Sequence, residues 1–289
     1  MSSALRAHLH KPELTVAPGV FELISATLAD QHDFPTLYMS GNGTVASALG
    51  LPDVGLATYT EMLNRIEAIT SRISTPLIAD GDTGYGGLLN VDRTVRGYER
   101  AGAAGIQIED QQAPKKCGFA AITEVIPLPA MVDKIKVALD ARVSEDFMIV
   151  ARTDARRGYG LNEALDRALA FEDAGADIIF IEAPESTEEM EIICKQVQKP
   201  KLLNMVDGRS TPVLPKAQIE DLGYNIAIFP CTGFLAATEA MRRSYATIAE
   251  EGSSLNVEAQ LCPFDEFVQI MGFDRAREFD ERWKDKSKY

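Results

Sequence analysis

Short apolar segments rich in β-branched residues recur along the chain, and segments with helical periodicity separate them. Eight of the apolar segments are predicted to be strands, at residues 15–20, 36–41, 76–82, 104–110, 147–154, 177–183, 201–206 and 224–230. Segments such as 61–73, 90–102, 129–142 and 162–175 carry apolar residues three and four positions apart, which predicts amphipathic helices. Strand and helix therefore alternate from one end of the chain to the other.

This alternation is typical of parallel sheets whose faces are covered by helices. Eight strand–helix units in 289 residues predict an α/β fold, a single (β/α)8 TIM barrel domain over residues 1–289, since about 250 residues is usual for that fold. Three helices end in a glycine before the next strand (Gly102, Gly175 and Gly223), where a helix C-terminus favours positive φ. An open, doubly wound sheet is the structural alternative.

The chain continues beyond the eighth predicted strand through more helix than a barrel needs. Residues 251–289 are predicted to form a C-terminal helical extension, and its apolar residues include Leu261, Phe264, Phe267, Ile270, Phe273, Phe279 and Trp283. Such an extension packs either on its own barrel or on a neighbouring subunit. Both arrangements stay open at this point.

The charge balance limits the possible partners. The chain has 29 Lys and Arg against 43 Asp and Glu, a formal net charge of −14. This charge repels phosphate backbones and anionic lipid surfaces, so we expect neither a nucleic acid nor a membrane as partner. Because no apolar run is long enough for a membrane span and the N-terminus lacks the apolar stretch of a secretory signal, a cytoplasmic protein is expected.

Histidine, cysteine and lysine usage excludes several kinds of site. The three histidines, His8, His10 and His32, all lie near the N-terminus, which disfavours a zinc enzyme. The four cysteines are far apart in sequence and include no CxxC pair, so neither a zinc site nor a disulfide framework is expected. The predicted strand ends carry no lysine, which disfavours a Schiff-base aldolase.

Polar residues gather at the C-terminal ends of the predicted strands, where a barrel of this kind places its functional groups. They are Ser40, Gly41, Asn42, Asp80, Asp82, Thr83, Glu109, Asp110, Arg152, Thr153, Asp154, Glu182 and Asn204. Carboxylates that converge on one mouth repel each other unless a cation lies between them, and oxygen ligands favour Mg²⁺, with Mn²⁺ possible. The alternative is that Asp80 and Asp82 cap a helix and Glu109 pairs with a basic side chain.

The segment after the fourth predicted strand, residues 111–124, contains a candidate reactive thiol. Two lysines precede Cys117, and nearby ammonium charges lower the pKa of a thiol. As a loop over the barrel mouth, the segment could bring Cys117 to a ligand and exclude water. An inert surface cysteine is the alternative.

Seven motifs in order resemble the isocitrate lyase and phosphoenolpyruvate mutase superfamily. They are YMSG (38–41), LPDVG (51–55), ADGDTGYGG (79–87), QIEDQ (107–111), PKKCG (114–118), ARTDA (151–155) and IEAPE (181–185). The resemblance runs from about residue 10 to residue 250. KKCG together with ARTDA resembles the carbon–carbon lyase branch, which includes 2,3-dimethylmalate and 2-methylisocitrate lyases, more than the phosphonate branch.

The resemblance implies roles for individual residues. Asp80 is similar to the acid that binds Mg²⁺ directly, and Asp53, Asp82 and Glu109 resemble those that reach it through water. Cys117 matches the thiol that protonates the departing carbanion. The residues implied to bind substrate are Ser40, Gly41, Asn42, Arg152, Asn204, Lys116 and Gly118, and the candidate bases are Tyr38 and Glu182. The resemblance also implies a homotetramer whose C-terminal helices are swapped between neighbouring barrels.

The implied reaction is cleavage of a small malate-like 2-hydroxy diacid into a 2-oxoacid such as pyruvate and a carboxylic acid. The chain departs from the lyase pattern at two positions: Phe119 stands where the motif usually has histidine, and Thr123 replaces a common lysine. A less polar gate suits 2,3-dimethylmalate better than isocitrate, whose extra carboxylate needs a cation. The chain is also much shorter than the isocitrate lyases.

Three other functions stay open. One is hydrolysis or decarboxylation of oxaloacetate at the same site. Another is the phosphonopyruvate or carboxyphosphonoenolpyruvate chemistry of the superfamily. The third is binding of metal and 2-oxoacid without turnover, if Phe119 and Thr123 have disabled the gate. All of these take a small di- or tricarboxylate or a related oxoacid as partner.

Overall fold

The computed structural model describes residues 2–117 and 124–284. Its strands are β1 (Thr15–Val20), β2 (Leu37–Met39), β3 (Leu77–Asp80), β4 (Gly105–Glu109), β5 (Met148–Thr153), β6 (Ile178–Ile181), β7 (Lys201–Asn204) and β8 (Ile226–Phe229). Its helices are α1 (Ser2–Leu9), α2 (Leu23–Asp30), α3 (Gly41–Leu49), α4 (Tyr59–Thr70), α5 (Leu88–Arg100), α6 (Leu128–Ala141), α7 (Ala155–Tyr159), α8 (Leu161–Asp173), α9 (Thr187–Gln196), α10 (Lys216–Leu222), α11 (Thr232–Glu251), the 3₁₀ helix η1 (Leu255–Gln260), α12 (Phe264–Ile270) and α13 (Phe273–Trp283).

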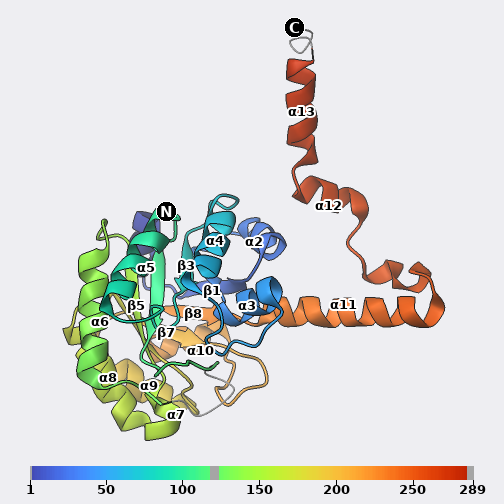
Figure 1. Ribbon diagram of the computed structural model, residues 1–289. Helices are drawn as coiled ribbons and strands as arrows, with labels where there is room; N and C mark the ends of the chain where they lie inside the picture. Colours follow the sequence, from blue (N-terminus) through green and yellow to red (C-terminus); the bar gives the residue numbers. More distant parts are fainter. Residues whose placement is uncertain (1, 118–123, 285–289) are drawn as a thin grey trace. The chain divides into compact units, whose positions relative to one another are not determined.

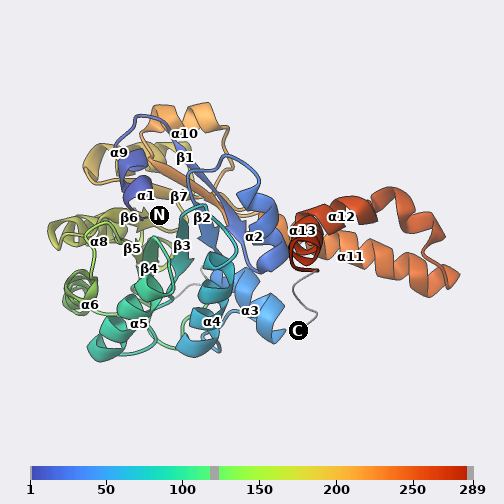
Figure 2. The same ribbon diagram turned by 90° about the horizontal axis from the view of Figure 1, so that it is seen from above.

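The eight strands form one closed parallel barrel in sequence order, with helices around it (Figures 1 and 2). Strand β1 closes the barrel by pairing with β8, with Thr15 opposite Ile226 and Pro18 opposite Phe229. Each predicted strand segment contains one strand of the barrel. The TIM barrel prediction is confirmed, and the open doubly wound sheet is wrong because β1 and β8 leave no free edge.

The strands place apolar residues low in the barrel and polar residues at its mouth. Side chains alternate between the two faces of a strand, so residues two apart share the barrel interior. Interior apolar residues Tyr38, Ile78, Met148, Val150, Ile178, Phe180, Leu202, Ile226 and Ile228 form one buried cluster, together with Leu5 and Leu9 of α1. Two residues beyond several of these lie polar side chains. The period of two therefore delivers Ser40, Asp80, Arg152, Glu182 and Asn204 to one end of the barrel.

A second buried cluster fills the layer between strands and helices, as expected for strands covered on both faces. The three glycines predicted at helix ends adopt positive φ: 89° at Gly102, 101° at Gly175 and 98° at Gly223. A side chain is disfavoured in this conformation, and glycine adopts it freely. The repeated helix-to-strand turn seen in the sequence is therefore a repeated backbone conformation.

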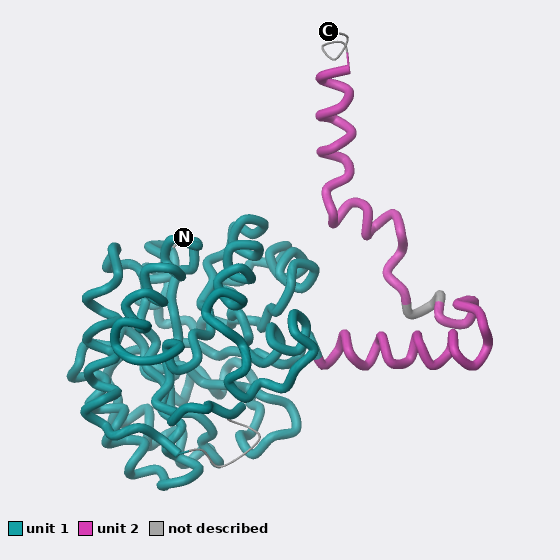
Figure 3. The backbone as a smooth tube through the Cα atoms, in the orientation of Figure 1, with its two compact units in different colours: residues 1–234 teal, residues 235–289 magenta. Residues whose placement is uncertain are grey.

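The chain divides into two compact units, residues 1–234 and 235–289 (Figure 3). The first contains the barrel. In the second, α12 and α13 follow η1, and Val257 is the one buried residue among 235–257 and 261–284. The prediction of a single domain over residues 1–289 stays a prediction. No helix in the described ranges is long and apolar enough to cross a bilayer.

Candidate active site

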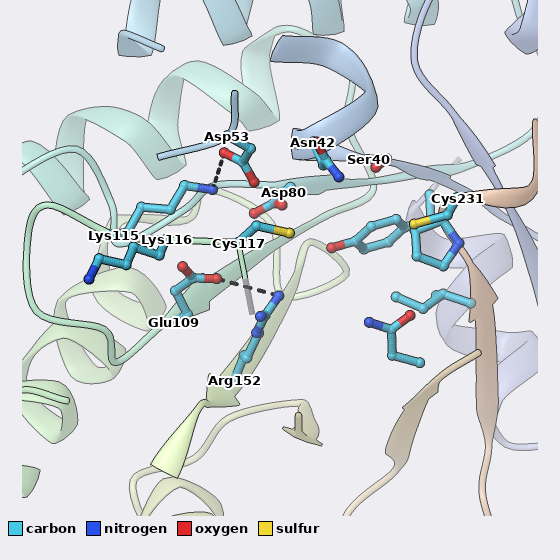
Figure 4. A pocket seen from close by; sticks show the side chains of 15 residues that line it. Ser40, Asn42, Asp53, Asp80, Glu109, Lys115, Lys116, Cys117, Arg152 and Cys231 are labelled. Carbon is cyan, nitrogen blue, oxygen red and sulfur yellow. Dashed lines mark ion pairs between the residues drawn. The ribbon is translucent and has the colours of Figure 1, made fainter. Parts of the chain in front are cut away.

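A cavity opens at the C-terminal ends of the strands (Figure 4). Most of the site residues predicted from sequence line it, drawn from loops and strand ends that are far apart in the chain. The lining consists of Tyr38, Ser40, Gly41, Asn42, Asp53, Asp80, Glu109, Lys115, Lys116, Cys117, Arg152, Asn204, Ile228, Pro230 and Cys231. Closure of the barrel brings them together, because all eight strands end at the same rim.

Four carboxylates and one lysine form what we call the acid side of the cavity: Asp53, Asp80, Asp82, Glu109 and Lys115. All five are buried. The ammonium of Lys115 lies 2.5 Å from Asp53 Oδ1 and 2.5 Å from Asp82 Oδ1. Lys115 thus turns inward from its loop and places a cation among these carboxylates. The sequence predicted a metal here, with pairing of Glu109 to a basic side chain as the alternative, and Glu109 lies 3.5 Å from Arg152 Nη1.

The electrostatics of the acid side follow from burial and mutual repulsion. Burial raises the pKa of Asp82 to about 7 against the opposing effect of Lys115. Burial also raises the pKa of Glu109 well above the usual range, although Arg152 opposes it. Burial alone would lower the pKa of Lys115, but the surrounding carboxylates raise it. The acid side holds more carboxylates than cations and favours a further positive charge.

The N-terminus of α3 faces Asp80. Ser40 caps this helix, its hydroxyl accepting a hydrogen bond from the Gly43 amide at 3.2 Å. A Cβ added to Gly41 would lie 2.4 Å from Asp80 Oδ2, so only glycine permits this close approach. The first amides of α3 and the Asp80 carboxylate consequently share one edge of the cavity, and such amides favour anions.

Four residues form the arginine side: Arg152, Asp154, Glu182 and Asn204. Asp154 holds the Arg152 guanidinium through two contacts, Nε to Oδ2 at 2.9 Å and Nη2 to Oδ1 at 2.8 Å. Asn204 Nδ2 donates to Glu182 Oε2 at 3.2 Å, and burial raises the pKa of Glu182. Glu182 also lies 3.5 Å from Arg152 Nη2. The cation of this side comes from strand β5 itself.

Gln107 and Tyr38 connect the two sides at the base of the cavity. The Tyr38 hydroxyl donates to Gln107 Oε1 at 2.6 Å, and Gln107 Nε2 donates to Asp80 Oδ1 at 3.1 Å. Burial and the Asp80 carboxylate raise the pKa of Tyr38 well above its ordinary value. Tyr38 is therefore a neutral hydrogen-bond donor in this arrangement.

The loop that carries Cys117 is tied to the acid side. The backbone N–H of Cys117 donates to the Asp53 carbonyl at 3.0 Å, in addition to the ion pair between Lys115 and Asp53. The backbone N–H of Lys116 donates to Gln111 Oε1 at 2.8 Å. Figure 4 shows the half-buried Cys117 side chain directed into the cavity near Asp80. Cys117 therefore lines the cavity, and its reactivity stays a prediction.

The donor set fits a hydrated hard cation. The acid side offers oxygen ligands only, and Glu109 Oε1 is buried without a hydrogen-bond partner among the described residues. No three His, Cys, Asp or Glu side chains within those residues converge closely enough to enclose a metal ion directly. Mg²⁺ usually keeps several waters and needs one or two carboxylates, so this spacing suits it.

Two of the predicted site residues, Asp82 and Glu182, are not among the residues that line the cavity. Asp82 pairs with Lys115, and Glu182 contacts Arg152 and Asn204. Gly118 falls outside the described residues, as do Phe119 and Thr123. From the sequence, Lys115 was expected only as a charge near Cys117, and Gln107 and Cys231 were not predicted as site residues. Gln107 could have been found, because it precedes Glu109 by two and so shares its side of strand β4.

The closed barrel with a polar cavity at the C-terminal ends of its strands is the architecture of a barrel enzyme. A family model described as "Phosphoenolpyruvate phosphomutase" matches residues 5–249. The chain is 45% identical to a 2,3-dimethylmalate lyase of Eubacterium barkeri over 98% of both chains. It is 42% identical to a 2-methylisocitrate lyase of Aeropyrum pernix, over 93% of this chain and 86% of the relative. A solved structure of an oxaloacetate acetylhydrolase with 3,3-difluorooxalacetate superposes with a TM-score of 0.91 at 34% identity, covering 97% of this chain and 96% of that one.

The chain therefore belongs to the phosphoenolpyruvate mutase and isocitrate lyase superfamily, and it is a lyase of that superfamily. The resemblance stated from its motifs is confirmed.

Proposed function

We propose that the protein is a Mg²⁺-dependent lyase that cleaves the C2–C3 bond of a small malate-like 2-hydroxy diacid, giving a 2-oxoacid such as pyruvate and a carboxylic acid. The observation that carries the proposal is one cavity that holds Asp80 and Glu109, Arg152 and Asn204, and the thiol of Cys117. The names of the two relatives above support a substrate of the 2,3-dimethylmalate or 2-methylisocitrate type.

The acid side would hold the ion, with Asp80 as direct ligand and Asp53, Asp82 and Glu109 acting through water. Mg²⁺ would supply positive charge to the oxygens of the 2-oxoacid. Ser40, Gly41 and Asn42 offer hydroxyl, amide and side-chain donors for its carboxylate at the N-terminus of α3. Arg152 adds a guanidinium for the same oxoacid, and Asn204, with Lys116 and Gly118 from the loop, binds the remainder of the substrate.

The chain supplies both proton-transfer groups. A base accepts the C2 hydroxyl proton, the C2–C3 bond breaks with its electron pair moving onto C3, and the Cys117 thiol donates a proton to C3. Of the two candidate bases, the pKa favours Glu182, although Tyr38 lines the cavity and Glu182 does not. Tyr38 has a raised pKa and already donates its proton to Gln107, whereas the raised pKa of Glu182 moves towards the range useful for a base.

A substrate panel tests the proposal. The purified protein is incubated with Mg²⁺ and 2,3-dimethylmalate, 2-methylisocitrate, isocitrate or malate, and 2-oxoacid release is followed. We expect release from 2,3-dimethylmalate or 2-methylisocitrate and its loss when the metal is chelated. No release from any of these acids would refute the lyase function for small diacids.

Hydrolysis of oxaloacetate is the second candidate, supported by the close superposition on an oxaloacetate acetylhydrolase. The same panel therefore includes oxaloacetate and phosphonopyruvate. Acetate and oxalate as products would identify the hydrolase, and pyruvate from oxaloacetate would identify a decarboxylase. Binding of oxalate with Mg²⁺ but no turnover on the whole panel would support a protein that binds without catalysis.

We further propose that the protein assembles as a homotetramer with helices exchanged between neighbouring chains. The second unit exposes large apolar side chains at Tyr245, Leu255, Phe264, Phe273 and Phe279, which an isolated chain would leave in water. Sedimentation velocity should give the mass of four 31.5 kDa chains. A monomer at micromolar concentration would contradict the assembly.

A further inference from the structure

Asp154 binds the Arg152 guanidinium on one side and does not cap a helix with its carboxylate. Asp154 occupies the N-cap position of α7, where an aspartate commonly accepts a backbone hydrogen bond, but its side chain makes no such bond. It instead accepts both contacts from Arg152, and both side chains are buried. A paired, two-point contact of this kind sets the plane of the guanidinium as well as its position.

The pair is supported from behind by Asp110, which is fully buried. Asp110 Oδ1 accepts from the backbone N–H of Asp154 at 2.9 Å, and Oδ2 accepts from the Thr153 hydroxyl at 2.7 Å. The carboxylate of the residue that follows β4 thus fixes the backbone at the end of β5. Asp110 itself does not line the cavity.

Arg167 of the outer helix α8 completes the connection. Its Nη1 donates to Asp110 Oδ2 at 3.2 Å and to the Ile126 carbonyl at 2.9 Å, while its Nε donates to Glu163 at 2.8 Å. Ile126 also donates its backbone N–H to the Asp110 carbonyl at 2.8 Å. One buried guanidinium therefore joins α8 to Asp110 and to Ile126, on the C-terminal side of the segment that carries Cys117, and Asp110 in turn contacts the end of β5.

Arg152 needs such support because carboxylates surround it. Its Nη1 lies 3.5 Å from Glu109 and its Nη2 lies 3.5 Å from Glu182, on two different sides. A long, flexible arginine held only by these contacts could turn toward Glu109 on the acid side and narrow the cavity. Asp154 binds Arg152 Nε and Nη2 at shorter distances, so that only Nη1 is directed toward Glu109.

We infer that Asp154 and Arg167 are positioning residues for Arg152: the connection Arg167–Asp110–Asp154–Arg152 holds the guanidinium ready for a substrate carboxylate before the substrate arrives. The inference rests on the proposed function in one respect, the binding of a carboxylate by Arg152. It extends that function to two residues outside the cavity lining, one of them on a helix that covers the barrel.

A ligand-free measurement tests the positioning directly. Phenylglyoxal modifies arginine, and mass spectrometry follows its reaction at Arg152 in the full-length protein. We expect D154N, which keeps the size of the side chain, to raise the modification rate at Arg152 severalfold, and R167K to raise it less. E163Q is the matched control, since Glu163 contacts Arg167 on the side away from Asp110, and should leave the rate unchanged. An unchanged rate in D154N, with the melting temperature of the wild type, would overturn the inference.

Calorimetry with oxalate in the presence of Mg²⁺ gives the second readout. We expect D154N to weaken oxalate binding about tenfold and R152K to weaken it at least as much. The double variant should bind no more weakly than R152K, because Asp154 acts through Arg152. If the double variant bound oxalate more weakly than R152K, by the product of the two single-variant losses in affinity, the inference would be overturned. Absence of oxalate binding in the wild type would count against the proposed function, and the phenylglyoxal rates would still decide the positioning of Arg152.

Discussion

The two sides of the cavity balance their charges in different ways. On the arginine side, the cation belongs to strand β5, and acceptors at the ends of β5 and β6 hold it. On the acid side, the carboxylates come from strands and a short loop, but the cation is Lys115, delivered by a segment outside the barrel sheet. The charge balance of the arginine side therefore comes from residues in or next to the strands. That of the acid side depends on a loop residue and on any cation that the cavity binds.

This difference matters because Lys115 and Cys117 are two residues apart on one loop. The contacts of Lys115 with Asp53 and Asp82, and of the Cys117 amide with the Asp53 carbonyl, attach that loop to the proposed metal site. We therefore expect a change in charge at the acid side to alter the position of the Cys117 thiol.

The largest effect is expected at Cys117, where the two sides meet. C117A removes the proton donor and should lower turnover by about 10² to 10⁴, a range typical of general acids, while oxalate binding changes little. C262S is the control, because Cys262 is exposed, and it should retain full activity. Turnover by C117A at the wild-type rate would remove the thiol from the mechanism.

The second prediction concerns the contribution of the acid side to the free energy of unfolding. K115Q leaves buried carboxylates without their cation, so the free energy of unfolding in metal-free buffer should fall by about 3–5 kcal/mol. Added Mg²⁺ should restore more stability to K115Q than it adds to the wild type, since it replaces the lost charge. Urea unfolding with and without Mg²⁺ measures both effects.

K116Q is the matched control for this prediction, because the neighbouring Lys116 side chain is exposed and should contribute little to stability. An equal loss for K115Q with and without Mg²⁺ would show that Lys115 acts only as packing. The stability of the acid side would then not depend on a positive charge that Mg²⁺ can replace.

The smallest effect concerns the second cysteine in the cavity, Cys231. Burial raises the pKa of its thiol to about 12, and that of Cys194 to about 11. A raised thiol pKa means less thiolate at a given pH, so both should react slowly with iodoacetamide at pH 8, and faster as the pH rises towards 10. Peptide mapping should find the exposed Cys262 labelled first. Rapid labelling of Cys231 at pH 8 would contradict its burial.

Most of the arginine side could be predicted from sequence, and less of the acid side. Arg152, Glu182 and Asn204 end predicted strands, and a period of two places them at the mouth as soon as the barrel is assumed. Asp80 and Glu109 follow the same rule. Asp82, two residues beyond β3, has a φ of 48°, outside the strand region, and its contact with Lys115 does not follow from the strand period. Its expected place beside the ion stays a prediction.

The roles of Lys115 and Asp154 show where sequence reasoning stops. Both residues belong to motifs recognised in the sequence, PKKCG and ARTDA. Partners elsewhere in the chain nevertheless decide which of the two lysines turns inward and where the Asp154 side chain points. Lys115 is fixed by Asp53 and Asp82, and the backbone of Asp154 by Asp110, which follows the neighbouring strand β4. No local pattern encodes such partners.

The sequence by itself determined the alternation of strand and helix, the glycine turns and the set of polar strand ends, because these follow from local periodicity and backbone preference. Only the tertiary structure decided which cation serves which carboxylate, which thiol enters the cavity and how an arginine on an outer helix supports one at the mouth. Those outcomes depend on distances across the closed barrel, and buried charges adopt the partners that such distances allow.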